Sequence, residues 1–228
     1  MSSTPFREDA IALATIDAEP VLAKWRAEES LSTAQRLARL VVGRPYVAMR
    51  GGGAGEEAGK VADGAEVLGL RFLGRLRLAG LIPFFGPVRE VWADRDGAVR
   101  ASLRRATAHG PIEAGMGPYL LTTMFEDGTA ITTWSRATVL PPNPLAINRT
   151  GTGKFVTDYE SHRAAVAEHT TETRRPLRVA DLETAVAVAT AHDTRLSPWA
   201  FATLARARLV LAATVAVGVV LSILRLRR

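Results

Sequence analysis

The chain has 228 residues, of which 29 are Lys or Arg, 23 are Asp or Glu, and none is Cys. The absence of cysteine excludes a disulfide-stapled fold, a thiolate metal site and a cysteine nucleophile. The net charge of +6 is gathered in residues 67–105, with eight basic and three acidic groups, and in residues 198–228, with five and none. Because the chain before residue 198 is close to neutral and carries no nucleic-acid-binding motif, we expect no nucleic acid partner.

The first 49 residues are predicted to form a helical segment. Helices are expected at residues 4–18, 20–29 and 32–43, and Ser32 with Gln35 forms a capping box for the third. The amino terminus contains several acidic residues and no apolar stretch typical of a signal peptide. We therefore expect the residues before 198 to stay in the cytoplasm.

A glycine-rich stretch at residues 50–64 is predicted to be a linker or an exposed loop. Within it, Gly53, Gly55 and Ala58 match the G-x-G-x-x-A pattern of dinucleotide-binding loops. No acidic residue lies between Val67 and Arg89 to bind a ribose. We therefore expect no nucleotide and no other cofactor.

Residues 65–197 are predicted to form an α+β domain that begins with an apolar segment carrying Arg71, Arg75 and Arg77. Apolar residues occupy alternate positions from Leu68 to Leu78, which favours a strand with one buried face. The same pattern also fits an amphipathic segment whose arginines contact an anionic lipid surface. The sequence leaves both alternatives open.

Two hairpins are the clearest fold signal in the chain. The first joins residues 88–92 and 98–103 through Asp96-Gly97, and the second joins residues 119–125 and 130–139 through Asp127-Gly128. An Asp-Gly pair between strand-like runs is typical of a tight hairpin turn. Helices are expected at residues 157–173 and 181–191. This order of elements predicts a four-stranded antiparallel sheet with helices on one side.

The first of these two helices places four metal-capable side chains on one face, at steps of three and four residues. They are Asp158, His162, His169 and Glu172. The two histidines are two turns apart, roughly 10 Å, so a metal ion would need one of the carboxylates as well. A solvated helix face explains the same residues, and the sequence does not decide between the two.

Residues 198–228 are predicted to form one transmembrane helix at the carboxyl terminus. The run from Leu209 to Leu224 carries no charge, and at 1.5 Å per residue it covers roughly 24 Å of the ~30 Å hydrocarbon core. Four flanking residues are expected to anchor it at the two interfaces: Trp199, Arg206, Arg208 and Arg225. A buried core helix is the alternative explanation.

Together these features predict a single-pass, tail-anchored bacterial membrane protein that is not an enzyme. Arginine outnumbers lysine 26 to 3, a usage typical of high-GC genomes. Its α+β domain would lie at the cytoplasmic membrane face and bind a protein partner or the lipid surface. The alternative is a membrane-tethered enzyme or metal-binding protein that works through the face of the helix with His162.

Overall fold

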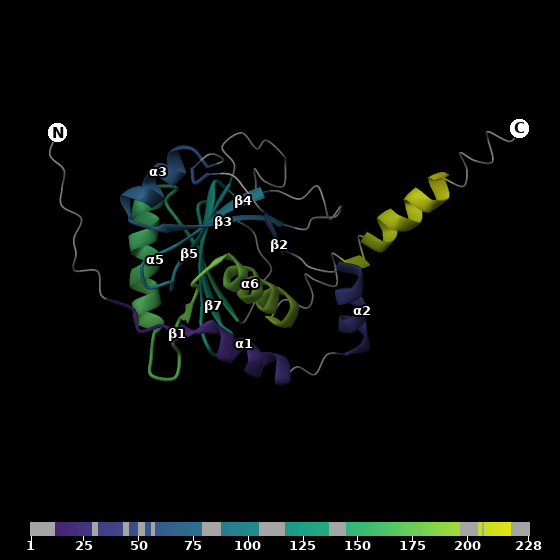
Figure 1. Cartoon of the computed structure of the whole chain (residues 1–228), viewed down its shortest axis with the longest axis horizontal. Coiled ribbons are helices and arrows are strands. Elements are labelled where there is room, and N and C mark those ends of the chain that lie inside the picture. The colour runs from purple at the N-terminus through teal and green to yellow at the C-terminus, as the bar shows by residue number, and fades with distance from the viewer. Residues whose placement is uncertain are drawn as a thin grey trace, which may run out of the picture.

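A seven-stranded mixed sheet forms the centre of the computed structural model (Figure 1). The structure describes residues 12–28, 32–42, 46–49, 53–55, 58–78, 88–104, 117–136, 145–196, 205–206 and 208–219. The strands lie in the order β2-β3-β4-β5-β6-β7-β8, so each pairs with its neighbour in sequence. All pairs are antiparallel except β7 and β8, which are parallel.

The strands have these bounds: β2 Tyr46–Met49, β3 Arg71–Leu78, β4 Val88–Ala93, β5 Arg100–Arg104, β6 Tyr119–Met124, β7 Ala130–Trp134 and β8 Ala146–Thr150. A second, two-stranded sheet joins distant parts of the chain. In it, β1 (Ile16–Asp17) pairs in parallel with β9 (Leu177–Arg178).

Both predicted hairpins are confirmed as β4–β5 and β6–β7. In each turn an aspartate side chain accepts a backbone N–H: Asp94 Oδ1 from Val99 at 3.1 Å, and Asp127 Oδ1 from Thr129 at 2.8 Å. Gly97 and Gly128 have φ angles of 72° and 85°, which glycine adopts without strain.

The prediction of a small antiparallel sheet is wrong, although the chain is α+β. The sheet has seven strands and is mixed, because β2 and β3 extend it at one edge and β8 at the other. The sequence of β8, AINRT, lacks the alternation of a half-buried strand. Its parallel pairing with β7 depends on a long connection, not on a local turn signal.

Strand β3 contains a β-bulge that interrupts the regular alternation of its side chains between the two faces of the sheet. The register with β4 shifts between Phe72 and Gly74. Phe72 packs against Trp92 with ring centroids 5.2 Å apart, whereas Leu76 packs with Val91 on the opposite face. A bulge adds one residue to one strand, so the side chains after it point to the face opposite the one expected.

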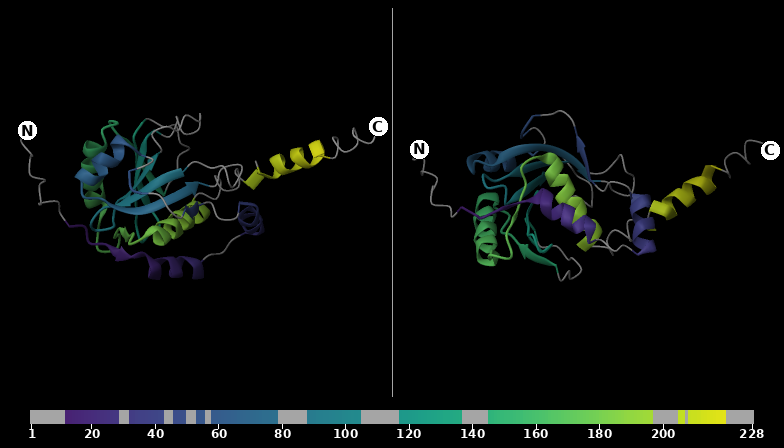
Figure 2. Two further views of the ribbon diagram at one scale, coloured as in Figure 1. Left: turned by 45° about the horizontal axis from the view of Figure 1, so that its top comes forward. Right: turned by 60° about the horizontal axis from the view of Figure 1, so that its bottom comes forward.

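Helices cover both faces of the sheet, not one as predicted. On one face, called here the α5 face, α3 (Lys60–Val67) and α5 (Phe155–His169) pack against Trp92, Leu103, Tyr119 and Leu121. On the other, called the α6 face, α1 (Ala18–Ala27) and α6 (Leu182–Leu196) enclose a second cluster with Met124 and Ala130. In Figure 2, α1 and α6 lie side by side and away from α3 and α5.

Two predicted helix starts are confirmed by their caps. Ser32 N donates to Gln35 Oε1 at 2.8 Å and Gln35 N donates to Ser32 Oγ at 3.3 Å, which is the expected capping box before α2 (Thr33–Val42). Asp181 Oδ1 accepts the backbone N–H of Thr184 at 2.7 Å at the start of α6. Each cap satisfies helix amides that would otherwise lack an acceptor.

The predicted transmembrane helix is wrong, and with it the tail-anchored location and the binding of lipid through this helix. Among the described residues, none of the helices combines the length and the hydropathy needed to cross a bilayer. Residues 208–219, the longest described part of the predicted membrane helix, are helical. They expose several apolar side chains: Leu209, Val210, Val215, Val217 and Val219.

Candidate functional site

The residues predicted to anchor the helix are divided between described and undescribed parts of the chain. Trp199, Leu224 and Arg225 lie outside the described residues. Arg206 is exposed, whereas Arg208 is buried and donates from NH1 to Val41 O at 3.3 Å, at the end of α2. Burial lowers the pKa of the Arg208 guanidinium. Arg208 therefore ties this helix to α2.

The three arginines of β3 proposed to contact lipid have different environments. Arg71 NH2 donates to Ala180 O at 2.7 Å, next to the start of α6. Arg75 is buried and lies 3.6 Å from Glu90 Oε1. Arg77 shares a face with Arg75 and pairs in register with Val47. The bulge thus separates Arg71 from the other two, so they do not form one cationic face.

The glycine-rich stretch does not present its amides to a ligand where it is described. Gly55 N donates to Glu90 Oε2 at 3.1 Å, and Arg75 NH2 donates to Gly53 O at 3.1 Å. Glu90, which is fully buried, also accepts from Trp92 Nε1 at 3.4 Å. The carboxylate of Glu90 therefore occupies the place near Gly55 that a phosphate would need.

Asp158, the first of the predicted metal-capable residues, organises the start of α5. Its carboxylate accepts hydrogen bonds from Tyr119 OH at 2.5 Å, from Thr152 N at 2.7 Å and from Gly153 N at 3.1 Å. Burial opposes ionisation, but these bonds outweigh it and hold the pKa of Asp158 below its usual value. Burial and the same carboxylate raise the pKa of Tyr119.

His162 is fully buried between two strands of the sheet. Its Nε2 lies 3.1 Å from Thr123 Oγ1, and its Nδ1 lies 2.8 Å from Thr133 Oγ1. Because Thr123 donates its hydroxyl to Ala98 O, it accepts from His162, which assigns the proton of the neutral ring to Nε2. Burial, with a smaller effect of Arg149, lowers the pKa of His162 to about 3.

His162 therefore has both ring nitrogens engaged and no exposed surface. A general base must reach the proton of a substrate, which this ring cannot do. His169 Nδ1 contacts Ala165 O at 2.8 Å on the next turns of the helix, and Glu172 is exposed. Among the described residues no three His, Asp or Glu side chains gather where they could hold a metal ion.

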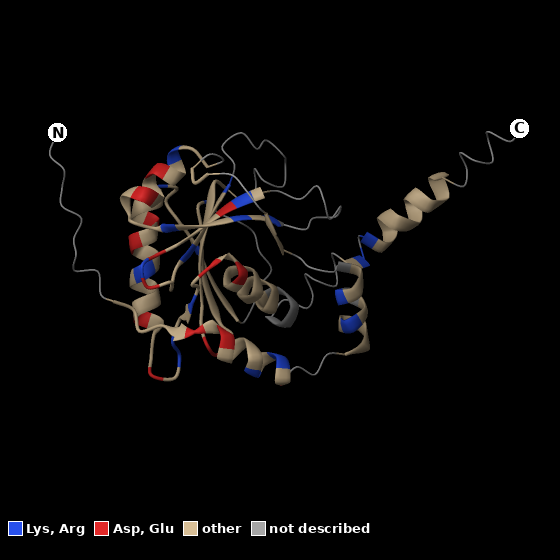
Figure 3. Ribbon diagram, viewed as in Figure 1, with Lys and Arg blue, Asp and Glu red and all other residues tan. Residues whose placement is uncertain are grey.

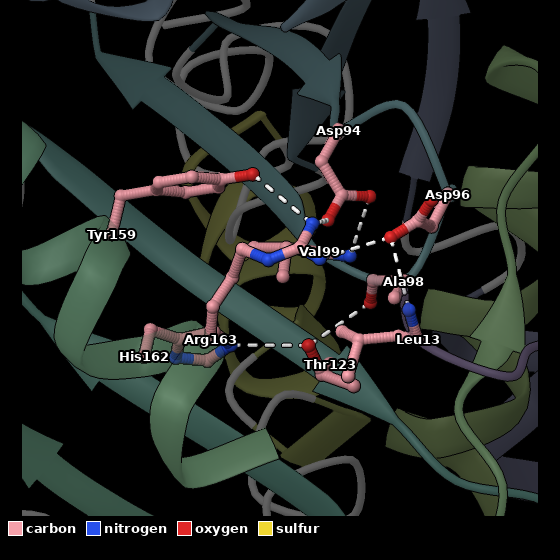
Figure 4. Close-up of polar contacts among 9 residues, drawn as sticks. All are labelled: Leu13, Asp94, Asp96, Ala98, Val99, Thr123, Tyr159, His162 and Arg163. Carbon is pink, nitrogen blue, oxygen red and sulfur yellow. Dashed lines mark hydrogen bonds and ion pairs between the residues drawn. The ribbon is translucent and has the colours of Figure 1, made fainter. Parts of the chain in front are cut away.

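An ion-pair network joins α5 to the first hairpin (Figure 4). Arg163 NH1 lies 2.6 Å from Asp94 Oδ2, and Arg163 NH2 lies 2.9 Å from Asp96 Oδ2. Burial raises the pKa of Asp94, although Arg163 opposes this shift. Asp96 Oδ2 also accepts from Leu13 N at 3.2 Å, so the same carboxylate holds the amino-terminal segment. This network links α5, the first hairpin and the amino-terminal segment.

The α6 face has a different composition. In the seven strands of the sheet, as described, seven arginines stand against one acidic residue, Glu90, which lies on the α5 face. Figure 3 shows most acidic residues on helices and turns, whereas Lys and Arg occur on strands and on helices. Three of these arginines, Arg89, Arg100 and Arg104, share the α6 face of β4 and β5.

The three arginines surround Ser102. Arg100 and Arg104 are two residues before and after it on β5, and Arg89 is paired directly with Arg104 on β4. At about 3.4 Å per residue and 4.8 Å per strand, all three Cα atoms lie within roughly 8 Å of the Cα of Ser102. Arg100 NH1 donates to Ala185 O of α6 at 3.0 Å, which fixes its position. Val91, which is fully buried, is paired directly with Ser102 and lies on the same face.

Two threonines continue this surface across β6 and β7. Thr122 is paired with Arg100 on one side and with Thr132 on the other, so all three side chains share the α6 face. Thr122 is 6% exposed, and its Oγ1 has no hydrogen-bond partner in the part of the chain that the structure describes. A buried hydroxyl without a partner is unfavourable and points to a missing acceptor or donor.

We call the set Arg89, Arg100, Ser102, Arg104, Thr122 and Thr132 the arginine–threonine face. The excess of positive charge in residues 67–105 is visible in the sequence, where the arginines of β3 are its most prominent part. The register of β4, β5 and β6 would have been needed to find the group.

Comparison of the chain with models of protein families, with curated proteins and with solved structures gives no match.

Proposed function

We propose that the protein binds a small oxyanion on the arginine–threonine face. The observation that supports this proposal is that Arg89, Arg100 and Arg104 share one face of β4 and β5 with Ser102. Guanidinium groups bind carboxylate and phosphate oxygens through pairs of parallel hydrogen bonds, so three of them form a strong oxyanion site. The unsatisfied hydroxyl of Thr122, next to Arg100, supplies a further donor.

The proposal assigns a binding function, not catalysis. Of the groups suggested for chemistry by the sequence, His162 is fully buried and Asp158 already accepts three or more hydrogen bonds. The arginine–threonine face contains no nucleophile stronger than a hydroxyl and no general base among its six residues. An arginine cluster without such groups is suited to holding an anion.

Calorimetric titration with inorganic phosphate at low ionic strength tests the proposal. Arg104→Gln removes one guanidinium while keeping a side chain of similar reach. Since a hydrogen bond to a charged group contributes about 1.5–3 kcal/mol, we expect roughly 10- to 100-fold weaker binding of phosphate.

Arg95→Gln is the matched control, because it removes the same charge from an exposed position in the β4–β5 turn. It is expected to leave phosphate binding within about twofold, since exposed charges are screened by salt and water. Equal weakening by both variants would show general attraction to a basic protein and would contradict the site. Absence of phosphate binding by the unmodified protein would also contradict it.

A further inference from the structure

Exposed apolar side chains gather at one end of the molecule, on α2 and on the helix at residues 208–219. These two helices are neighbours, because Arg208 NH1 donates to Val41 O at 3.3 Å. Figure 1 and Figure 2 show the 208–219 helix, in yellow, extending from α2 away from the sheet. Of the eleven large apolar side chains that are exposed among the described residues, seven lie here, and we call them the apolar end: Leu37, Leu40, Leu209, Val210, Val215, Val217 and Val219.

The 208–219 helix is apolar on every side. From Leu209 to Val219 it carries no charged residue, and every residue in this stretch except Leu211 is exposed. Its one hydroxyl, that of Thr214, donates to Val210 O at 2.9 Å within the same helix. In folded proteins a helix that is apolar all round is buried, and a large exposed apolar patch marks a surface that binds a partner.

The composition of this helix determines what can cover it. A surface with charges or free hydrogen-bonding groups would lose their hydration here and find no polar partner in exchange. The complementary surface is therefore apolar and uncharged, as the same helix is in a second copy of the chain. In an isologous pair one patch is used twice, so no other complementary surface is required.

The area of the apolar end is sufficient for a weak dimer. Full burial of a Val or Leu side chain removes roughly 60–120 Å² from water. The seven side chains are 53–79% exposed. Together with the exposed alanines of the helix, two copies can bury roughly 1,000 Å² between them. This area lies at the lower end of specific interfaces, so we expect a dissociation constant in the micromolar range.

We propose that two copies of the chain associate through the apolar end, with their 208–219 helices antiparallel and centred on residues 213 and 214. A parallel pair would place two exposed Arg206 side chains and two positive helix starts side by side, which is unfavourable. The antiparallel pair separates these charges. Because the stretch from Leu209 to Val219 spans roughly 16 Å, its far end would approach Leu37 and Leu40 on α2 of the other copy. The inference is independent of the proposed oxyanion site.

Sedimentation equilibrium of the full chain from about 1 to about 200 µM tests the proposal. The unmodified protein is expected to change from monomer to dimer over this range. Val210→Glu places a charge against an apolar helix and should weaken the dimer at least about 10-fold. Val67→Glu is the matched control, because Val67 at the end of α3 is 68% exposed and Val210 is 66% exposed. The control should leave the dissociation constant within about twofold.

The absence of cysteine from the chain allows a test of the antiparallel geometry. Ala213→Cys, at the centre of the pair, should form a disulfide between two copies under mild oxidation. Val210 of one copy would lie opposite Val217 of the other, so Val210→Cys mixed with Val217→Cys should also cross-link. Val217→Cys alone should not, because its two Cα atoms would be roughly 10 Å apart along the helices, beyond the ~7 Å limit for a disulfide.

Several outcomes would overturn the proposal. A monomer throughout this concentration range would contradict it, and so would equal weakening by Val210→Glu and Val67→Glu, which indicates non-specific association. Cross-linking of Val217→Cys alone but not of the mixture would show a parallel pair. In a monomer, protection of Ala213→Cys from a maleimide reagent would show that the same chain covers the helix. Binding of a monomer to phosphatidylcholine vesicles that Val210→Glu abolishes would show that lipid covers it.

Discussion

The two faces of the same sheet bury different polar groups. On the α5 face, several of them are paired within the protein: Glu90 with Arg75, His162 with two threonines, and Asp158 with Tyr119. On the α6 face, the strands contribute three clustered arginines, no acidic residue, and a buried hydroxyl that has no partner among the described residues. The first arrangement stabilises the fold, and the second is the basis of the proposed oxyanion site.

This difference teaches that burial of a polar group does not by itself mark a functional site. His162 is fully buried, yet both of its ring nitrogens have hydrogen-bond partners within the protein. Thr122 is less conspicuous in the sequence, but its hydroxyl has no hydrogen-bond partner among the described residues. Incomplete hydrogen bonding beside clustered charge is the more informative sign.

The largest expected effect on the α5 face comes from removing Arg163, the arginine of the ion-pair network. Arg163→Met leaves Asp94, whose side chain is 1% exposed, without its guanidinium partner. Removal of one partner of a buried pair destabilises proteins by about 3–5 kcal/mol, which is the loss expected in urea unfolding at pH 7. Methionine keeps the helix propensity and length of the side chain.

The double variant Arg163→Met with Asp94→Asn is the control for this loss. Because it removes both charges, it should recover a large part of the stability. A loss below about 1 kcal/mol for Arg163→Met alone would show that the network is solvated and would remove the contrast between the faces.

A second test concerns pH. The pKa of His162 is lowered to about 3 in the folded protein, whereas in the unfolded chain it is near 6.5. As pH falls below 6.5 the unfolded chain takes up a proton that the folded protein excludes. The contribution of His162 to stability is therefore complete above pH 6.5 and is lost as pH falls toward 3, by about 2 kcal/mol at pH 5.

His162→Gln cannot take up this proton, so its free energy of unfolding should fall less steeply between pH 6.5 and 4, by up to about 1.4 kcal/mol per pH unit. Thr133→Val removes the hydroxyl that donates to Nδ1 but keeps the imidazole. Thr133→Val should lower the free energy of unfolding but leave its dependence on pH unchanged. Identical slopes for the unmodified protein and His162→Gln would mean that the ring is protonated in the fold.

The smallest expected change in stability is a gain and concerns the α6 face. Thr122→Val replaces a buried, unsatisfied hydroxyl by a methyl group of the same shape. We expect the protein to gain about 1 kcal/mol of stability, seen as a rise in Tm of about 2–4 °C, while phosphate binding becomes weaker. A variant that is destabilised, or that binds phosphate as before, would show that the hydroxyl serves the fold.

Sequence reasoning succeeded where structure is determined locally. The Asp-Gly turns predict both hairpins because glycine at Gly97 and Gly128 supplies the positive φ that the turns need. The capping box at Ser32 and Gln35 is local in the same sense. Strand β8 could not be found this way, since its only partner is reached through a parallel crossover.

The candidate site depends on information that no local pattern contains. Arg89 and Arg104 are neighbours only because of the register of β4 with β5, and the bulge before Gly74 moves Arg75 away from the face of Arg71. A period of two predicts which residues share a face in a regular strand, but it cannot show where the register shifts. The excess of charge in residues 67–105 was visible, whereas its distribution between the two faces was not.

The pairing of β1 with β9 determines when this protein can finish folding during synthesis. Ile16 N donates to Pro176 O at 2.9 Å, and α1 packs on α6. The partners of β1 and α1 are therefore synthesised about 160 residues after these elements themselves. At 5–20 residues per second, a ribosome needs about 8 to 30 s to make that stretch. During this time Val21, Leu22 and Trp25, which end in the core, have none of their α6 partners. Until α6 is made, the apolar surface of the amino-terminal helix stays without these partners.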